Sequence, residues 1–300
     1  MQSPLLCWEC GDYLVDLSDP VIMAILNVTP DSFSGDGMKG SVDSARARAE
    51  QAVLDGAGIL DIGGETTKPG SEGTSVQEEL DRVIPVVEAL RQFDVPLSVD
   101  TMKPAVMRES ILAGASIIND VNALREPGAI ETVVTSGVGV CVMHMQGAPR
   151  SMQNAPQYLD VIAEVDAFLE ERIALLETAG MGRARISIDP GFGFGKTLDH
   201  NIELFRRQSI FSRHGLPLLI GVSRKSMLGK ITGRDVCDRM PASVVAAVLA
   251  VQRGASVLRV HDVAETRDAL AIWAAIDRTS AKSVEDAFCS RHNRHQNRGD

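Results

Sequence analysis

Residues 96–120, PLSVDTMKPAVMRESILAGASIIND, contain a strand–helix–strand unit. The apolar run Pro96–Val99 ends in Asp100, and a helical stretch then leads to the apolar run Ile117–Ile118, which ends in Asn119. Short runs of Ile, Val and Leu without polar alternation are typical of strands that are buried on both faces of a parallel sheet. This stretch therefore predicts two neighbouring parallel strands joined by a crossover helix.

The same alternation continues along the rest of the chain. Eight strands in all, with separations of roughly 20 to 45 residues that can hold a crossover helix, predict a single-domain (β/α)8 TIM barrel. An open doubly wound sheet is the alternative, but no Gly-x-Gly-x-x-Gly follows the first strand to support a dinucleotide fold. The six further apolar runs are Val21–Leu26, Ile59–Leu60, Val138–Met143, Arg185–Ile188, Leu218–Val222 and Val257–Leu258.

A glycine stands between a helix tail and the next strand at five places. Glycine can adopt the left-handed conformation that ends a helix, so each one predicts a turn at the end of the barrel opposite the catalytic loops. The five segments are Leu54-Asp-Gly56-Ala, Leu112-Ala-Gly114-Ala, Thr135-Ser-Gly137-Val, Thr178-Ala-Gly180-Met and Gln252-Arg-Gly254-Ala.

The two ends of the chain differ from the barrel. Residues 1–20 predict a hairpin that turns at Gly11-Asp12 and covers the bottom of the barrel formed by residues 21–278, and residues 279–300 predict a polar, disordered tail. Cys7-x-x-Cys10 has the spacing of a redox or zinc motif, but zinc needs four ligands and no second pair exists. We interpret the five cysteines as reduced thiols.

Hydropathy and net charge indicate which partners and which cellular location to expect. No apolar run approaches the ~20 residues that span a bilayer, and no signal core follows the N-terminus, so we expect a cytoplasmic protein without membrane contact. The net charge of −10 argues against nucleic acid as a partner. An acidic protein can still hold an anionic substrate in a locally basic cleft.

Polar residues follow every predicted strand, and in a TIM barrel these strand ends carry the chemistry. After the first strand comes Asn27-Val-Thr-Pro-Asp-Ser-Phe-Ser34, and after the second comes Gly63-Gly64-Glu65-Thr66-Thr67-Lys68-Pro69-Gly70. Both segments combine hydrogen-bonding groups with glycine nearby, which predicts mobile loops 1 and 2 over the barrel mouth. An ordinary capped turn is the alternative for the first loop.

Three acidic or amide residues predict a site for a heterocycle. Asp100 and Asn119 end neighbouring strands, and a carboxylate with an amide can bind the donor–acceptor edge of a ring. The alternative for Asp100 is a helix cap, because a helix follows it. Asp189 begins Asp-Pro-Gly-Phe-Gly-Phe-Gly-Lys196, whose phenylalanines Phe192 and Phe194 predict an aromatic wall beside a carboxylate.

Basic groups gather after the last two strands. Ser223-Arg-Lys-Ser226 follows the seventh strand and Arg259-Val-His261 ends the eighth. This end of a TIM barrel often binds phosphate, so we expect an anion site and expect Arg224, Lys225, Arg259 and His261 to face the cleft.

Seven motifs in order connect these sites to one family. They are Asn-Val-Thr-Pro-Asp-Ser-Phe, Ser-Val-Asp-Thr, Ile-Asn-Asp, Met-His-Met-Gln-Gly, Asp-Pro-Gly-Phe-Gly-Phe-Gly-Lys, Ser-Arg-Lys-Ser and Arg-Val-His-Asp. With them the chain resembles the dihydropteroate synthases of folate biosynthesis from about Val21 to Trp273. The resemblance implies a transferase that joins 4-aminobenzoate to 6-hydroxymethyl-7,8-dihydropterin diphosphate and releases diphosphate. It also implies a homodimer through the last helices and competition by sulfonamides.

The resemblance implies a role for each site residue. It makes Asp100, Asp189, Lys225, Arg259 and His261 the catalytic group. The pterin contacts are Asp100, Asn119, Asp189 and Lys225, with Met143, Phe194 and Gly221 shaping the pocket and Arg259 stacking on the ring. The diphosphate contacts are Asn27, Arg259 and His261, with Mg²⁺ held at Asn27, and the aminobenzoate surroundings are Phe33, Thr67, Lys68, Pro69 and Ser226.

The chemistry implied by the resemblance needs no enzyme nucleophile. Loss of diphosphate leaves a delocalised pterin cation, so the protein must stabilise the leaving group and exclude water until the arylamine attacks. The chain departs from the family at Gly35-Asp36 in the first loop and at Lys68, where the family has arginine. The alternative functions are a pterin-binding methyltransferase barrel and a non-catalytic paralogue.

Overall fold

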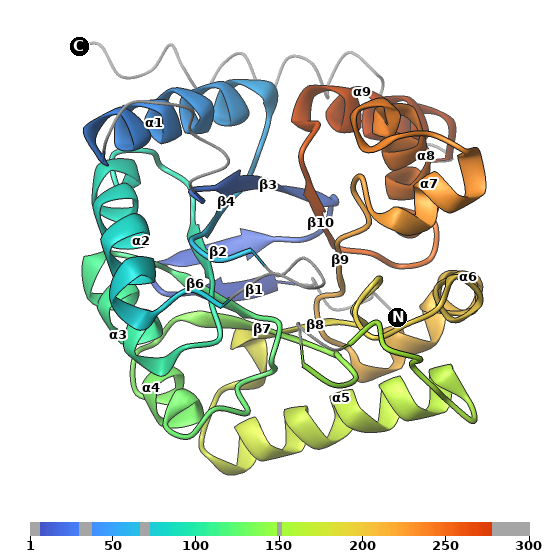
Figure 1. Cartoon of the computed structure of the whole chain (residues 1–300), viewed down its shortest axis with the longest axis horizontal. Coiled ribbons are helices and arrows are strands. Elements are labelled where there is room, and N and C mark those ends of the chain that lie inside the picture. Colours follow the sequence, from blue (N-terminus) through green and yellow to red (C-terminus); the bar gives the residue numbers. More distant parts are fainter. Residues whose placement is uncertain (1–6, 30–37, 67–72, 149–151, 278–300) are drawn as a thin grey trace.

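Eight parallel strands form the centre of the protein in a computed structural model, which describes residues 7–29, 38–66, 73–148 and 152–277. Neighbouring strands pair in the order β8-β7-β6-β5-β4-β3-β10-β9, and a bridge between Ile188 and Leu218 joins the two ends of this order. The structure confirms the predicted TIM barrel (Figure 1). The strands are β3 (Val21–Asn27), β4 (Ile59–Gly63), β5 (Leu97–Asp100), β6 (Ile117–Asp120), β7 (Gly139–Met143), β8 (Ile186–Asp189), β9 (Leu219–Ile220) and β10 (Val257–Val260).

Helices surround these strands on the outside (Figure 1). Local sequence fixes several of their starts: Ser75 and Glu78 form a capping box before α2, and the Asp160 carboxylate accepts from two backbone N–H groups of α5. The α-helices are α1 (Met38–Asp55), α2 (Val76–Leu90), α3 (Pro104–Ala113), α4 (Ala129–Val134), α5 (Val161–Thr178), α6 (Leu198–Arg206), α7 (Ser226–Thr232), α8 (Met240–Val251) and α9 (Val263–Asp277). Short 3-10 helices lie at η2 (Arg183–Arg185), η3 (Gln208–His214) and η4 (Val236–Asp238).

The glycines predicted to end helices behave as expected. Gly56 has a φ of 106° and Gly114 a φ of 115°, and the other three also have positive φ. A side chain is strained in this conformation, which explains why glycine recurs there.

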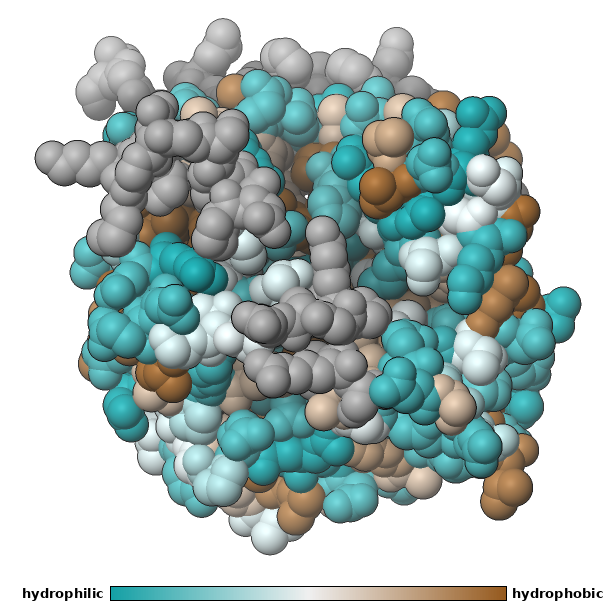
Figure 2. Space-filling model, viewed as in Figure 1, coloured by the Kyte–Doolittle hydropathy of each residue, from teal (hydrophilic) through white to brown (hydrophobic). Residues whose placement is uncertain are grey.

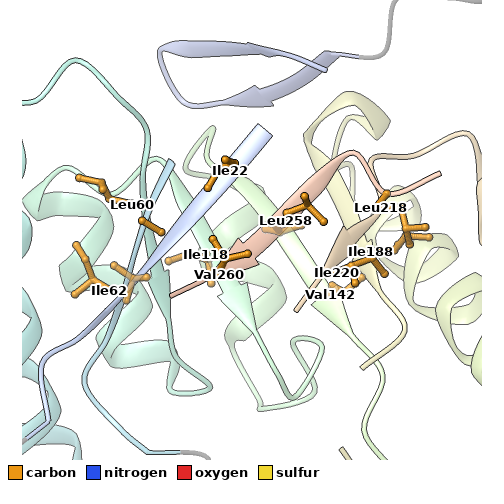
Figure 3. Close-up of a cluster of buried hydrophobic side chains, with 14 of the residues drawn as sticks. Ile22, Leu60, Ile62, Ile118, Val142, Ile188, Leu218, Ile220, Leu258 and Val260 are labelled. Carbon is orange, nitrogen blue, oxygen red and sulfur yellow. The ribbon is translucent and has the colours of Figure 1, made fainter. Parts of the chain in front are cut away.

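Successive side chains along a strand lie in two different environments. Leu60, Ile62 and Ile118 belong to the large cluster that includes the buried residues of the outer helices (Figure 3). The residues between them on each strand belong to a different cluster or are polar, as expected when successive side chains point to opposite faces. This alternation assigns every second strand residue to the inside of the barrel.

The N-terminal hairpin closes the bottom of the barrel. Strands β1 (Cys7–Cys10) and β2 (Tyr13–Asp16) pair antiparallel, and Trp8, fully buried, donates from Nε1 to the Arg185 carbonyl oxygen at 3.0 Å. Trp8 packs in one cluster with the inward residues at the starts of the strands, which are Met23, Ile59, Ile117, Cys141, Leu219 and Val257. The predicted hairpin is therefore confirmed, and it packs against the inward residues at the starts of the strands.

Cys10 lies in the same cluster, so the Cys-x-x-Cys spacing has a structural explanation. Its side chain is fully buried, and burial raises the pKa of its thiol well above the usual value. The four cysteines of the described residues are unpaired.

Two strand ends differ from the sequence expectation. The second strand was expected to stop at Leu60, but β4 continues through Asp61 to Gly63 because Asp61 is paired with other buried polar groups. The seventh was expected over Leu218–Val222, but β9 contains only Leu219–Ile220. Within the described part of the chain, every helix is too short or too polar to cross a membrane.

Candidate active site

On three of the strands, β4, β6 and β10, the inward face is apolar at its start and polar two residues later. Ile59 is followed on this face by Asp61, Ile117 by Asn119, and Val257 by Arg259. The same alternation brings Asp100 and Asp189, at the ends of β5 and β8, to the mouth of the barrel. The expected gathering of polar residues at the carboxyl ends of the strands is therefore present, above the cluster that the hairpin closes.

Arg259 joins two carboxylates across the barrel. Its Nε donates to Asp61 Oδ2 at 2.6 Å and its Nη2 donates to Asp100 Oδ2 at 2.8 Å. Asp61 also accepts from Ser98 Oγ at 2.5 Å and from Asn119 Nδ2 at 3.4 Å. Burial alone would lower the pKa of Arg259, but the two carboxylates outweigh this effect and raise it.

Asp100 faces this cluster and does not cap the following helix. Helix α3 begins after Lys103 without a side-chain cap, so the capping alternative is wrong. Burial raises the pKa of Asp100, and the neighbouring charge of Arg259 opposes this rise. The Asp100 side chain is 13% exposed and Asp61 is fully buried, so of these two carboxylates only Asp100 can be reached from the mouth.

Asp189 and Lys225 form a second part of this polar cluster. Asp189 Oδ1 accepts from the backbone N–H of Gly191 at 2.7 Å, and Lys225 Nζ donates to the Phe192 carbonyl oxygen. Burial lowers the pKa of Lys225 to about 8, with Asp189 opposing the change. Burial also raises the pKa of Asp189, and the charge of Lys225 opposes that rise. The two groups therefore stabilise each other's charged forms in a desolvated site.

A buried lysine holds the loop after β8 together. Lys196 Nζ donates to the carbonyl oxygens of Gly191 at 2.8 Å and Phe194 at 3.0 Å, and lies 2.9 Å from His144 Nδ1. Burial lowers the pKa of His144 to about 2, so the neutral imidazole accepts the hydrogen bond. Gly191 has a φ of 72°, and a Cβ there would lie 1.8 Å from the His144 carbonyl oxygen, so only glycine fits.

The two phenylalanines of this loop have different roles. Phe192 is fully buried and its ring centroid lies 5.4 Å from that of Phe205, so it belongs to the core and not to the predicted wall. Phe194 is partly buried, and Lys225 Nζ lies 4.6 Å from its ring centroid. Phe194 also packs on the small cluster that contains Met143. The aromatic wall expected beside Asp189 is therefore formed by Phe194 alone.

The basic end of the site is smaller than the sequence suggested. The structure places Arg224 in an ion pair with Asp262, with Nε 3.1 Å from Oδ2, so the expectation that this cation faces the cleft is wrong. His261 is exposed and lies 3.0 Å through Nδ1 from Ser223 Oγ. Partial desolvation and the charges of Arg259 and Arg224 lower the pKa of His261. A neutral His261 can donate one hydrogen bond towards an anion.

Three further expected residues lie around this mouth. Asn27 ends β3 opposite Gly63 and is partly buried. Gly221 lies beside Arg259 and Lys225, since a Cβ on it would be 3.7 Å from Arg259 Cβ and 4.0 Å from Lys225 Nζ. Ser226 is exposed at the first position of α7.

The expected residues of loops 1 and 2, namely Phe33, Thr67, Lys68 and Pro69, lie outside the described residues. The two flanks of the second loop are described and are tied to each other. Glu65 accepts from the Thr74 backbone N–H at 2.7 Å and from Lys103 Nζ at 2.6 Å, and Lys103 also donates to the buried Glu79.

Sequence analysis gave no individual role to Asp61, which is one of the polar residues that follow the predicted strands, or to Lys196. A polar residue interrupting an apolar run was the signal for Asp61, and a lysine at the end of a glycine-rich loop was the signal for Lys196. Their partners are distant in the chain, at Arg259 and His144, so neither pairing follows from local spacing.

Comparison with known proteins agrees with the barrel fold. The family described as "Pterin binding enzyme" matches residues 23–261, which places the chain among the pterin-binding enzymes. Dihydropteroate synthase of Escherichia coli (strain K12) is 51% identical over 259 residues, covering 86% of this chain and 92% of that relative. The chain belongs to the dihydropteroate synthase family.

Two solved structures of this family show how far the likeness extends. Yersinia pestis dihydropteroate synthase, in complex with a sulfonamide drug, is 47% identical with a TM-score of 0.87 and covers 91% of this chain and 100% of that one. Burkholderia cenocepacia dihydropteroate synthase, complexed with 7,8-dihydropteroate, is 46% identical with a TM-score of 0.84 and covers 90% of this chain and 96% of that one.

Proposed function

We propose that the protein joins 6-hydroxymethyl-7,8-dihydropterin diphosphate to 4-aminobenzoate and that the polar cluster in the barrel mouth binds the pterin. The carbon–oxygen bond from the pterin methylene to diphosphate breaks, and a bond to the arylamine nitrogen forms as that nitrogen loses a proton. The observation that carries the proposal is the gathering of Asp100, Asn119, Asp189, Lys225 and Arg259 in one buried polar cluster at the carboxyl ends of the strands.

The pocket suits a flat, polar, uncharged ring. Asp100 and Asp189 accept hydrogen bonds from the ring's amino and N–H groups, while Lys225 donates to a ring acceptor. Phe194 and Met143 supply an apolar wall, and Gly221 leaves room for the ring beside Arg259. The side chain of Arg259 lies next to the ring, where a guanidinium plane can stack.

The mouth stabilises the leaving group. In this proposal Arg259, His261 and Asn27 bind the diphosphate, and fixed donors at such a position favour the departing charge. An arylamine is nucleophilic at neutral pH, so His261 serves as a diphosphate ligand and no general base is needed. Asp100, Asp189, Lys225, Arg259 and His261 thus form the catalytic group.

Magnesium fits this site only as a partner of the substrate. The described residues contain no cluster of three metal-ligating side chains, and Asn27 offers a neutral amide oxygen at the strand end. Mg²⁺ commonly takes one or two protein oxygens and several phosphate or water oxygens. Asn27 would hold the ion against the diphosphate, and the bound ion would neutralise the charge that the leaving group gains.

The aminobenzoate site is completed by the loops. Phe33, Thr67, Lys68, Pro69 and Ser226 surround the second substrate in this proposal, with Ser226 at the start of α7 and the ties between Glu65, Lys103 and Thr74 fixing the flanks of the second loop. The side of the molecule in Figure 2 is mostly hydrophilic, with hydrophobic residues scattered over it, in keeping with polar, charged substrates.

We further propose a homodimer through the last helices and a cytoplasmic location. Helices α8 and α9 contact each other and expose apolar side chains, which a second copy of the chain would cover. These side chains are Val245, Leu249, Ile272 and Ile276. Sedimentation velocity of the protein and of Ile272→Asp tests the dimer. The unpaired cysteines of the described residues accord with a reducing compartment.

The decisive experiment is a coupled assay for diphosphate release together with chromatography of the product. Release that requires both substrates and yields 7,8-dihydropteroate supports the proposal. Lys225→Met should abolish most of this activity, while Lys230→Met, which changes an exposed lysine of the following helix α7, should not. Release of diphosphate without aminobenzoate, or binding of pterin diphosphate without any turnover, would contradict it.

A further inference from the structure

Asp61 is a buried carboxylate to which the reaction above gives no role. It is fully buried in the middle of β4, between apolar residues Leu60 and Ile62. An unpaired carboxylate in such a position would be strongly destabilising. Its presence therefore calls for a function that a leucine or valine at this position could not perform.

Both oxygens of Asp61 are already used. Oδ1 accepts from Ser98 Oγ at 2.5 Å, and Oδ2 accepts from Arg259 Nε at 2.6 Å. Asn119 Nδ2 lies 3.5 Å from Oδ1 and 3.4 Å from Oδ2. Because Asp61 is enclosed by these groups and has no exposed surface, a ligand in the pocket contacts its partners and not Asp61 itself.

The contact with Asp61 fixes the guanidinium of Arg259 at its Nε atom. Nε is bound to a carboxylate that the ligand cannot reach, whereas Nη2 is bound to Asp100, which the ligand can reach. A ligand that engages Asp100 therefore competes with only one of the two ion pairs. Asp61 keeps the plane of Arg259 in place throughout, and charged hydrogen bonds of this geometry are the strong ones.

The contact with Asn119 decides which end of its amide faces the pocket. A carboxylate only accepts hydrogen bonds, so the Asn119 nitrogen must point to Asp61. The Asn119 oxygen is then presented away from Asp61, as an acceptor. Without Asp61 the amide could bind either a donor or an acceptor.

We propose that Asp61 is a positioning residue that anchors Arg259 through Nε and orients Asn119 so that its oxygen meets an N–H group of the ring. The inference rests on the proposed function, since it assumes a pterin in the pocket. Asp61 would then influence ring recognition without touching the ring. By orienting Asn119 it would favour rings that place an N–H group opposite the Asn119 oxygen.

Asp61→Asn tests the inference with almost no change in shape. We expect the affinity for 6-hydroxymethyl-7,8-dihydropterin diphosphate, measured by calorimetry, to fall at least tenfold, and KM for this substrate to rise while KM for aminobenzoate changes less than threefold. Asp166→Asn is the matched control, because Asp166 is also a buried aspartate paired with an arginine, Arg213, and lies outside the pocket. It should leave the affinity within twofold of the parent.

A double-mutant cycle distinguishes positioning from general damage. In an Arg259→Met background, Asp61→Asn should cost no more than about threefold in affinity, because the main group that it positions is gone. Two results would overturn the inference. One is a double mutant whose loss of affinity equals the product of the losses in the two single mutants. The other is an Asp61→Asn variant that binds the pterin diphosphate as tightly as the parent.

Wild-type protein supplies a measurement that needs no variant to fold. The NMR signal of the Arg259 Nε–H should be protected from solvent exchange both without and with the pterin diphosphate, and rapid exchange in either state would overturn the anchor. If this signal is protected but no dihydropteroate is formed from the two substrates, the proposed function fails while the anchoring of Arg259 stands.

Discussion

Replacing Lys196 by methionine should loosen the loop that forms one wall of the pocket. The change keeps an unbranched side chain as far as Cε but removes the ammonium that bonds Gly191 O, Phe194 O and His144 Nδ1. Three buried acceptors left without a donor cost about 1–1.5 kcal/mol each, or about 3–4.5 kcal/mol together. Lys196 is itself 3% exposed and burial lowers its pKa well below the usual value, so removing the desolvated charge offsets part of this loss.

We therefore expect Lys196→Met to lose about 2–3 kcal/mol of unfolding free energy, seen as a fall in Tm of roughly 3–5 °C. Affinity for the pterin diphosphate should fall with it, because Phe194 and the Phe192 carbonyl oxygen that accepts from Lys225 are on this loop. Differential scanning calorimetry and titration calorimetry measure the two effects, with the exposed Lys230→Met as control. A Tm within 2 °C of the parent would refute the argument that these hydrogen bonds hold the loop.

Three further predictions concern the substrates. Asp189→Asn should weaken pterin diphosphate binding by ~2–3 kcal/mol, as for a charged hydrogen bond lost in a buried site, and an unchanged calorimetric affinity would remove Asp189 from the pocket. Because the pKa of Lys225 is lowered to about 8, its ammonium is lost as pH rises through about 8, so pterin affinity should decline there, and Lys225→Arg, which stays charged, should lack this decline. Lys68→Ala should lower kcat/KM for both substrates by roughly tenfold, or ~1.4 kcal/mol, with Lys68→Arg keeping or raising it; a parental rate in Lys68→Ala would show that this charge does not act in turnover.

Much of the fold could be predicted because its signals are local. Each apolar run predicts a strand, and each glycine such as Gly56 or Gly114 predicts a helix end, from a few neighbouring residues alone. Eight repeats of the strand–helix pattern are then compatible with few folds. The strand ends could not be placed from the same signals. Asp61 looked like the end of a strand because a carboxylate is unfavourable in a core, and only its pairing with a residue 198 positions away makes it a strand residue.

The sequence was enough to predict which residues gather in the site, but not which hydrogen bonds and ion pairs they form. Residues at strand ends converge in any TIM barrel, so Asp100, Asn119 and Asp189 were found from their positions. The partner of each charge depends on side-chain packing between distant segments. Arg224 follows a buried strand just as Lys225 does, yet its positive φ of 56° and its pairing with Asp262 take its charge out of the cleft.

The hairpin at the bottom of the barrel also sets an order of events during synthesis. Trp8 is synthesised 177 residues before its hydrogen-bond partner Arg185. At roughly 5–20 residues per second, about 9–35 seconds pass before that partner exists. Until then Trp8 and the strand-start residues that pack on it, such as Met23 and Ile59, lack part of the cluster that buries them, so apolar surface stays exposed on the nascent chain. The burial of Trp8 marks the moment at which that exposure ends.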